Sequence, residues 1–222
     1  MVTGYRSLVA LAAALGLSAG TPAEAAADGA RIAQAGNGAS AAPCVACHGT
    51  HGEGNAAAGF PRLAALPADY IVAQLQAMAA GTRASPVMMP IAKALTSGER
   101  QAVAAYYATL SPPAPVATSA VAPPPVAGKA LAEIGRWSQQ LPACDQCHGP
   151  GGVGVGTAFP PLAAQPASYL RSQLQAWKDG RRAGGPLDLM SGIARKLDPA
   201  DIQAVADYYA ARPARAANGG MP

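Results

Sequence analysis

The most regular pattern in the chain is an apolar stripe with the spacing of a helix. Ile71, Leu75 and Met78 lie four and three residues apart, and such a stripe forms one buried face of a helix. The pattern predicts a helix over 67–80, because a proline opens this segment and Gly81 directly follows it. Three residues repeat the stripe in the second half of the chain: Leu170, Leu174 and Trp177. The second helix is predicted to stop at the glycine that follows.

Capping patterns predict a further helix in each half. Thr96 is followed three residues later by Glu99, which is the spacing of a capping box. In the second half, Asp198 is placed to cap a helix whose first residue is Pro199. No segment alternates apolar and polar residues as a strand would. The chain is therefore predicted to be all-α.

The sequence contains one unit twice. Three segments of the first half return in the second half, at offsets of 100, 99 and 102 residues: 44–49 at 144–149, 60–65 at 159–164, and 101–107 at 203–209. This internal repeat predicts two tandem domains that differ by short loop insertions. Between them, 111–126 is rich in proline and alanine, which predicts a semi-rigid spacer in the polyproline II conformation.

The repeat and the spacer define the expected organisation of the chain. We expect an N-terminal domain over 26–112, a proline-rich linker over 113–127 and a C-terminal domain over 128–222. Residues 1–25 are expected to be a signal peptide.

The signal peptide is predicted from an arginine that precedes an apolar run over 7–17, and from an A-x-A pattern that ends at Ala25. The run is too short to span a bilayer, which takes about 20 residues. Export to the periplasm with cleavage near Ala25 or Ala27 is predicted, and an uncleaved N-terminal anchor is the alternative. No later stretch is long and apolar enough to span a bilayer, so the mature chain is expected to have no transmembrane segment.

Composition adds two constraints. Half of the residues are hydrophobic but only 5% are aromatic, so the core is filled by small aliphatic side chains or by a large apolar cofactor. The net charge is +4 and the chain lacks the Lys/Arg clusters of a nucleic-acid binder. No nucleic-acid partner is therefore expected.

All four cysteines lie in two Cys-x-x-Cys-His motifs, which is the pattern of c-type haem attachment. In the first motif, Cys44 and Cys47 are three positions apart, and each thiol can form a thioether to one haem vinyl group. The adjacent His48 then lies under the iron as its proximal ligand. The second motif repeats these three residues: Cys144, Cys147 and His148. The motifs predict two covalently bound haem c groups.

Three other uses of these cysteines are less consistent with the sequence. Two disulfides would leave the histidine after each second cysteine unexplained. A zinc site needs four ligands that converge, whereas the two motifs are separated by 100 residues and a proline-rich spacer. A thioredoxin-like redox pair needs a βαβ unit, which the pattern does not predict.

The second axial ligand of each iron is expected to be methionine. The chain has three histidines, and His51 is too near His48 to reach the far side of the same haem, so we expect it in a solvated loop. In the second repeat, Met190 is the candidate. In the first repeat, Met88 aligns with Met190, and Met89 is the alternative. Met78 aligns with a tryptophan of the helical stripe and is expected to pack in the core.

These features together resemble class I cytochrome c, and two such units in one exported chain resemble the cytochrome c4 family. The resemblance covers about 28–110 and 128–212 and implies two tandem class I cytochrome c domains joined by a Pro/Ala-rich linker. It also implies that Pro61 and Pro160 accept the hydrogen bonds of the proximal histidines. Two leucines match the leucine that packs on the haem: Leu63 and Leu162.

Arg83 and Arg182 occupy equivalent places in the two repeats. They are expected either to approach the haem propionates or to be solvated. The linker is longer and richer in proline than the family pattern, which leaves open whether the two domains pack face to face.

The resemblance implies an electron carrier without substrate chemistry of its own. The expected role is transfer between respiratory partners, from a quinol-oxidising complex toward a terminal oxidase. The first alternative is the dihaem subunit of a periplasmic dehydrogenase, of the flavocytochrome or alcohol dehydrogenase type. The second is a dihaem peroxidase, which would need an open position on one iron.

Overall fold

The computed structural model describes residues 22–112 and 126–214. Within these ranges the secondary structure is helical, and the only β pairing is four isolated bridges. The α-helices are α1 (Pro22–Ala35), α2 (Val45–His48), α3 (Ala68–Ala80), α4 (Met88–Ala94), α5 (Ser97–Thr109), α6 (Val126–Glu133), α7 (Asp145–His148), α8 (Ala167–Lys178), α9 (Leu189–Arg195) and α10 (Pro199–Ala210). Three 3₁₀ turns accompany them in the C-terminal half: Trp137–Gln139, Pro150–Gly152 and Pro186–Asp188.

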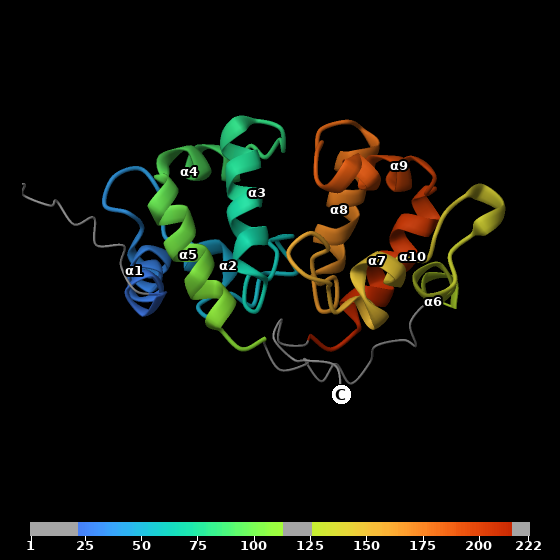
Figure 1. Cartoon of the computed structure of the whole chain (residues 1–222), viewed down its shortest axis with the longest axis horizontal. Helices are drawn as coiled ribbons and strands as arrows, with labels where there is room; N and C mark the ends of the chain where they lie inside the picture. Colours follow the sequence, from blue (N-terminus) through green and yellow to red (C-terminus); the bar gives the residue numbers. More distant parts are fainter. Residues whose placement is uncertain (1–21, 113–125, 215–222) are drawn as a thin grey trace, which may run out of the picture.

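The described helices form two similar halves that lie side by side, α1 to α5 and α6 to α10 (Figure 1). In the first half α5 packs against α1 and α3, and α3 also contacts α4. In the second half α10 packs against α6 and α8, and α8 contacts α9. Helices α3 and α8 flank the junction between the halves (Figure 1). None of the described helices is long and apolar enough to cross a membrane.

The helices predicted from periodicity and caps are confirmed. Helix α3 buries all three residues of its predicted stripe, including Met78, which is 8% exposed. Helix α5 begins after the capping box of Thr96 and Glu99. Helix α10 begins after Asp198, whose side chain accepts from the backbone N–H of Asp201, and the Asp201 carboxylate accepts from the N–H of Asp198 in return.

Two glycines allow helices to cross at very short range. A Cβ atom on Gly29 of α1 would lie 2.0 Å from the carbonyl oxygen of Ala102 in α5. A Cβ atom on Gly128 of α6 would lie 2.1 Å from the carbonyl oxygen of Ala204 in α10. Since backbone atoms cannot move away as a flexible side chain would, only glycine fits at either crossing.

The candidate methionines lie in short helices: α4 begins at Met88, and a proline at its third residue is compatible with a first helical turn. The bounds of the linker differ from the sequence expectation. Helix α6 begins at Val126 and takes in the end of the predicted linker. The rest of that linker, and residues 1–21 of the predicted signal peptide, lie outside the described residues.

The two halves pack against each other through reciprocal contacts. Arg83 and Arg182 face each other in an antiparallel bridge. The backbone N–H of Ala84 donates to the carbonyl of Arg181 at 2.9 Å, and the N–H of Ala183 donates to the carbonyl of Thr82 at 3.1 Å. The two donors occupy equivalent positions of the repeat, and so do the two acceptors. Contacts across a two-fold axis have this reciprocal pattern. The sequence left open whether the two domains pack against each other. The structure shows that they are in direct contact.

Acid is expected to weaken the C-terminal half through Asp201. The hydrogen bond from the Arg136 guanidinium, at 2.6 Å, holds the pKa of this buried carboxyl below its usual range. A carboxyl of this kind adds stability that is present above its unfolded-state pKa of about 3.9 and is lost as the pH falls through its folded-state pKa. Asp201→Asn is expected to lower the free energy of unfolding by about 1–3 kcal/mol at pH 7, and by less at pH 3. Urea unfolding at the two pH values measures this difference.

Asp28→Asn serves as the matched control. Asp28 lies 4.0 Å from Arg31 and its side chain is 69% exposed, so its replacement is expected to change stability by no more than about 0.5 kcal/mol. An Asp201→Asn variant that loses the same stability at pH 3 as at pH 7 would contradict the role of the carboxylate charge.

Candidate haem-binding sites

Each Cys-x-x-Cys-His motif forms one turn of helix. In the first half, Cys44 caps α2, Cys47 lies in it and His48 ends it. Residues three apart on a helix share a face, so the two sulfur atoms of each motif lie on the same side. Three residues form the same turn around α7: Cys144, Cys147 and His148. All four cysteines are free and half-buried, which leaves their thiols available for thioether bonds.

Both motif histidines are buried and held in one orientation. The Nδ1 atom of His48 donates to the carbonyl oxygen of Pro61 at 2.8 Å. The Nδ1 atom of His148 donates to the carbonyl oxygen of Pro160 at 2.9 Å. Because a carbonyl only accepts, Nδ1 carries the proton in each ring and Nε2 carries the lone pair. This is the tautomer that ligates a metal through Nε2.

The surroundings of these histidines fit an iron ligand. Nε2 of His48 is buried and has no hydrogen-bond partner in the described part of the chain. Burial lowers the pKa of His48 and of His148, so both rings stay neutral, as metal ligation requires. A buried, neutral imidazole with an unpaired nitrogen is costly unless a partner is bound there. The donor set suits the iron of haem c.

The candidate methionines lie in the first turns of α4 and α9. Met88 is half-buried and packs against the core of its half. It shares a helix face with Ala92, four residues on, which is fully buried. Met89 shares its face with Lys93, which is exposed. In the second half Met190 is half-buried and shares its face with the fully buried Ala194. This pattern favours Met88 over Met89 as the residue that faces the interior.

The remaining residues singled out in the sequence differ in their burial. Leu63 and Leu162 are half-buried and pack against the cores of their halves. His51 is exposed, as expected for a solvated loop residue. No three histidine, cysteine or acidic side chains converge within residues 22–112 and 126–214 in the way a metal site made of protein ligands alone would need.

Arg83 and Arg182 are not solvated, so that alternative is wrong. Each is 6% exposed and lies at the junction of the halves. Arg83 donates to Tyr169 at 2.9 Å and to Gln173 at 2.8 Å, both from the other half. Three bonds from Arg182 mirror this arrangement: to Gln173 at 2.8 Å, Gln74 at 2.8 Å and Tyr70 at 3.4 Å. The family pattern alone did not identify this network.

Sequence reasoning also missed a buried pair at the junction. Arg62 is completely buried and Gln165 is 3% exposed. The backbone N–H of Arg62 donates to Gln165 Oε1 at 3.0 Å, and Gln165 Nε2 donates to the carbonyl of Arg62 at 3.0 Å. A signal was present in the repeat itself. Where the second copy has Pro161 the first has Arg62, and where the first has Leu66 the second has Gln165.

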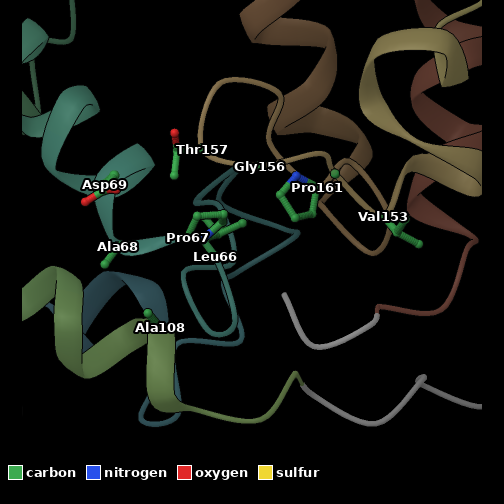
Figure 2. A pocket seen from close by; sticks show the side chains of 10 residues that line it. Leu66, Pro67, Ala68, Asp69, Ala108, Val153, Gly156, Thr157 and Pro161 are labelled. Carbon is green, nitrogen blue, oxygen red and sulfur yellow. The ribbon is translucent and has the colours of Figure 1, made fainter. Parts of the chain in front are cut away.

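A cavity of about 380 Å³ opens at the junction of the halves. Figure 2 shows that the start of α3 and the loop after α7 line it from opposite sides. None of the motif cysteines or histidines lines it, so it is a feature of the interface rather than of the attachment sites. Ten residues line it: Leu66, Pro67, Ala68, Asp69, Ala108, Val153, Gly154, Gly156, Thr157 and Pro161.

Comparison with known proteins finds one family model that matches each half of the chain, and relatives that match across both halves. A family model described as cytochrome C oxidase, cbb3-type, subunit III matches residues 25–106 and 130–208. A thiosulfate dehydrogenase electron acceptor from Thiomonas intermedia is 49% identical over 176 residues, which are 78% of this chain and 80% of that protein. Cytochrome c4 from Pseudomonas aeruginosa is 37% identical over 173 residues, which are 77% of this chain and 84% of that protein.

One solved structure extends this likeness to three dimensions. Thiosulfate dehydrogenase (TsdBA) from Marichromatium purpuratum matches with a TM-score of 0.78 and 47% identity over 84% of this chain. The match covers 40% of that protein, so this chain spans less than half of its length. With two family matches and two attachment motifs, the chain belongs to the cytochrome c4 family: it has two tandem cytochrome c domains, binds two covalently attached haem c groups and carries electrons.

Proposed function

We propose that this chain accepts electrons from a thiosulfate dehydrogenase in the periplasm and passes them to a respiratory partner. The observation that carries this proposal is the higher sequence identity to a thiosulfate dehydrogenase electron acceptor than to a cytochrome c4. The chain is 49% identical to a protein named thiosulfate dehydrogenase electron acceptor and 37% identical to a protein named cytochrome c4, over similar lengths. A periplasmic dehydrogenase, the class of partner in the first alternative, is therefore favoured, but one that oxidises thiosulfate rather than one of the flavocytochrome or alcohol dehydrogenase type.

The residues of each half have separate roles in this proposal. Haem c supplies an iron that gains or loses one electron. The motif cysteines would anchor it, and His48 and His148 would supply Nε2 as an iron ligand. Met88 and Met190 would supply a sulfur ligand, which favours the reduced iron. If the protein supplies both of these ligands in each half, no position is left open for a substrate, which favours a carrier over a peroxidase.

Hydrogen bonds and packing around these residues hold the ligands in place. The carbonyls of Pro61 and Pro160 hold each imidazole in one orientation and keep its proton on Nδ1. Leu63 and Leu162 pack against the cores of their halves and would help to exclude water from the apolar face of each bound haem. Since each site takes one electron, the whole chain takes two from its donor.

The periplasmic location rests on the predicted signal peptide over 1–25, of which residues 1–21 lie outside the described residues. The onward acceptor is proposed to be a terminal oxidase. A quinol-oxidising complex is the competing electron donor from the sequence analysis, and the two donors are separated by experiment.

Rapid mixing of the oxidised, haem-loaded chain with thiosulfate and a purified thiosulfate dehydrogenase tests the donor. Reduction is expected to follow at a rate that depends on the dehydrogenase concentration, because the chain docks to that enzyme. The haem α-band absorbance measures reduction. Thiosulfate without the enzyme is the blank, and a cytochrome c4 at equal concentration is the matched control.

The donor proposal is contradicted if the cytochrome c4 control is reduced as fast as this chain. A quinol-oxidising membrane preparation, supplied with quinol in place of thiosulfate, forms the second arm. Faster reduction by that preparation than by the dehydrogenase would assign the chain to the quinol-dependent route instead.

A further inference from the structure

The two repeats are nearly identical in the segment that follows the attachment motif, except at two positions. Residues 60–66 read Phe-Pro-Arg-Leu-Ala-Ala-Leu, and 159–165 read Phe-Pro-Pro-Leu-Ala-Ala-Gln. The first departure pairs Arg62 with Pro161, and the second pairs Leu66 with Gln165. At these two positions each copy therefore has one polar and one apolar residue. The polar residues are Arg62 in the first copy and Gln165 in the second.

The two polar residues contact each other across the junction. Gln165 forms two reciprocal hydrogen bonds with the backbone of Arg62, each of 3.0 Å. Both residues are buried. A side-chain amide that satisfies a backbone N–H and a backbone carbonyl at once fixes the distance and the angle between the two segments. The pair therefore joins the two domains in one specific orientation.

The guanidinium of Arg62 bonds to equivalent positions in both domains. It donates through Nη1 to the carbonyl of Ala64 and through Nη2 to the carbonyl of Ala163 at 3.1 Å. Ala64 and Ala163 are the same residue of the repeat. A group that binds both copies of one position lies near the approximate two-fold axis that relates them. Only one side chain fits there, so the two repeats must differ at this residue.

The two apolar residues, Leu66 and Pro161, occupy the positions that the two-fold axis relates to Gln165 and Arg62, and they leave a cavity there. Leu66 and Pro161 both line the cavity of about 380 Å³ at the junction (Figure 2). The contact that Arg62 and Gln165 make is therefore made once, and the equivalent place is a cavity.

The charge of Arg62 is not neutralised by an acid. None of the ion pairs in the described part of the chain includes Arg62, and its Nε atom is buried without a hydrogen-bond partner there. Burial lowers the pKa of Arg62 to about 10, so the guanidinium keeps its positive charge at neutral pH. A buried charge acts over a longer range than one in water, because the protein interior screens it less.

We propose that Arg62 is a positioning residue shared by both domains: it locks their orientation through Gln165, and its buried charge raises the reduction potentials of both haem sites together. A nearby cation favours the reduced iron, which carries one positive charge less than the oxidised iron. Both sites respond because the guanidinium is bonded in each domain three residues beyond the proline that holds the proximal histidine. This inference does not depend on which protein donates the electrons.

Potentiometric titration of three variants tests the effect of the charge. Arg62→Gln is expected to lower both midpoint potentials, whereas Arg62→Lys, which keeps the charge, stays close to the wild-type protein. Arg31→Gln is the matched control, because Arg31 is an exposed arginine of α1 and its loss is expected to leave both potentials unchanged. If Arg62→Gln lowers neither potential or only one, the proposed shared action of the charge is overturned.

Hydrogen exchange tests the lock without reference to electron transfer. The amides of Ala84 and Ala183 donate across the junction and report on its opening. Arg62→Pro with Gln165→Leu is expected to raise their exchange rates at least about tenfold, while the amides within α5 and α10 keep their protection.

A variant with four substitutions exchanges the pair between the two repeats. It tests whether the double variant loses a specific contact between the domains or simply loses its fold. It combines the two changes above with Pro161→Arg and Leu66→Gln. Because the axis relates the two positions, this variant is expected to regain the slow exchange of Ala84 and Ala183 and both potentials. Fast exchange in the variant with four substitutions, in a protein with its helices intact, would overturn the assignment of Arg62 to the axis.

Discussion

Gly29→Ala is expected to lower the free energy of unfolding of the N-terminal half by about 3 kcal/mol, the upper end of the usual cost of an overpacked core. The added methyl group would lie 2.0 Å from the carbonyl oxygen of Ala102 and 2.8 Å from Cβ of Tyr106. Helices α1 and α5 would therefore have to separate. For a domain of this size, the melting temperature is expected to fall by roughly 12–24 °C, as measured by circular dichroism of the haem-loaded protein.

Gly98→Ala is the matched control in the same half. Gly98 lies in α5, and apart from its chain neighbours and the backbone of its own helix no atom lies within 4 Å of the position a Cβ would take. Alanine is the better helix former, so this change is expected to raise stability by up to about 1 kcal/mol. The two Gly→Ala variants thus have opposite expected signs. A Gly29→Ala protein as stable as Gly98→Ala would contradict the close crossing of α1 and α5.

Replacement of an axial methionine is expected to have the largest effect on the redox properties. Met88→Ala is expected to lower one midpoint potential by an appreciable part of the roughly 0.8 V range that axial ligands span in haem proteins, because methionine favours the reduced iron. The same change is expected to remove about half of the weak far-red absorption band of methionine-ligated ferric haem. Met190→Ala is expected to act likewise on the other haem.

Met89→Ala is the control that decides between the two adjacent methionines. Since Met89 shares its helix face with the exposed Lys93, its loss is expected to leave both potentials and the far-red band unchanged. If Met89→Ala removes about half of the band and Met88→Ala does not, the assignment is reversed and Met89 is the ligand.

The features that local sequence encodes were predicted from the sequence alone. The buried stripe of α3 and the capping residues of α5 and α10 follow from side chains a few positions apart. The attachment motifs are equally local, since each is one helical turn. In these segments, hydrophobic periodicity and side-chain hydrogen bonds both favour the helix that forms.

The contacts between the domains could not be predicted in this way. Arg62 and Gln165 are 103 positions apart, and neither belongs to a periodic stripe or a motif. Their partners are backbone atoms, which leave no mark on the residue types around them. Arg83 and Arg182 were expected either to approach the haem propionates or to be solvated, because the sequence does not show which face of each domain is covered by the other. Only the difference between the two copies pointed to the junction.

The reciprocal pairing of Arg83 and Arg182 has a consequence for the origin of the chain. An interface in which each copy offers the same residues to the other is the kind that joins two identical subunits. The contacts of Arg83 and Arg182 are compatible with such a homodimer, whereas those of Arg62 and Gln165 are not, because identical subunits cannot carry a proline and an arginine at one position. Gene fusion removes that restriction, since each copy can then mutate independently. The asymmetric pair is thus a property that this interface can acquire only after its two halves share one polypeptide.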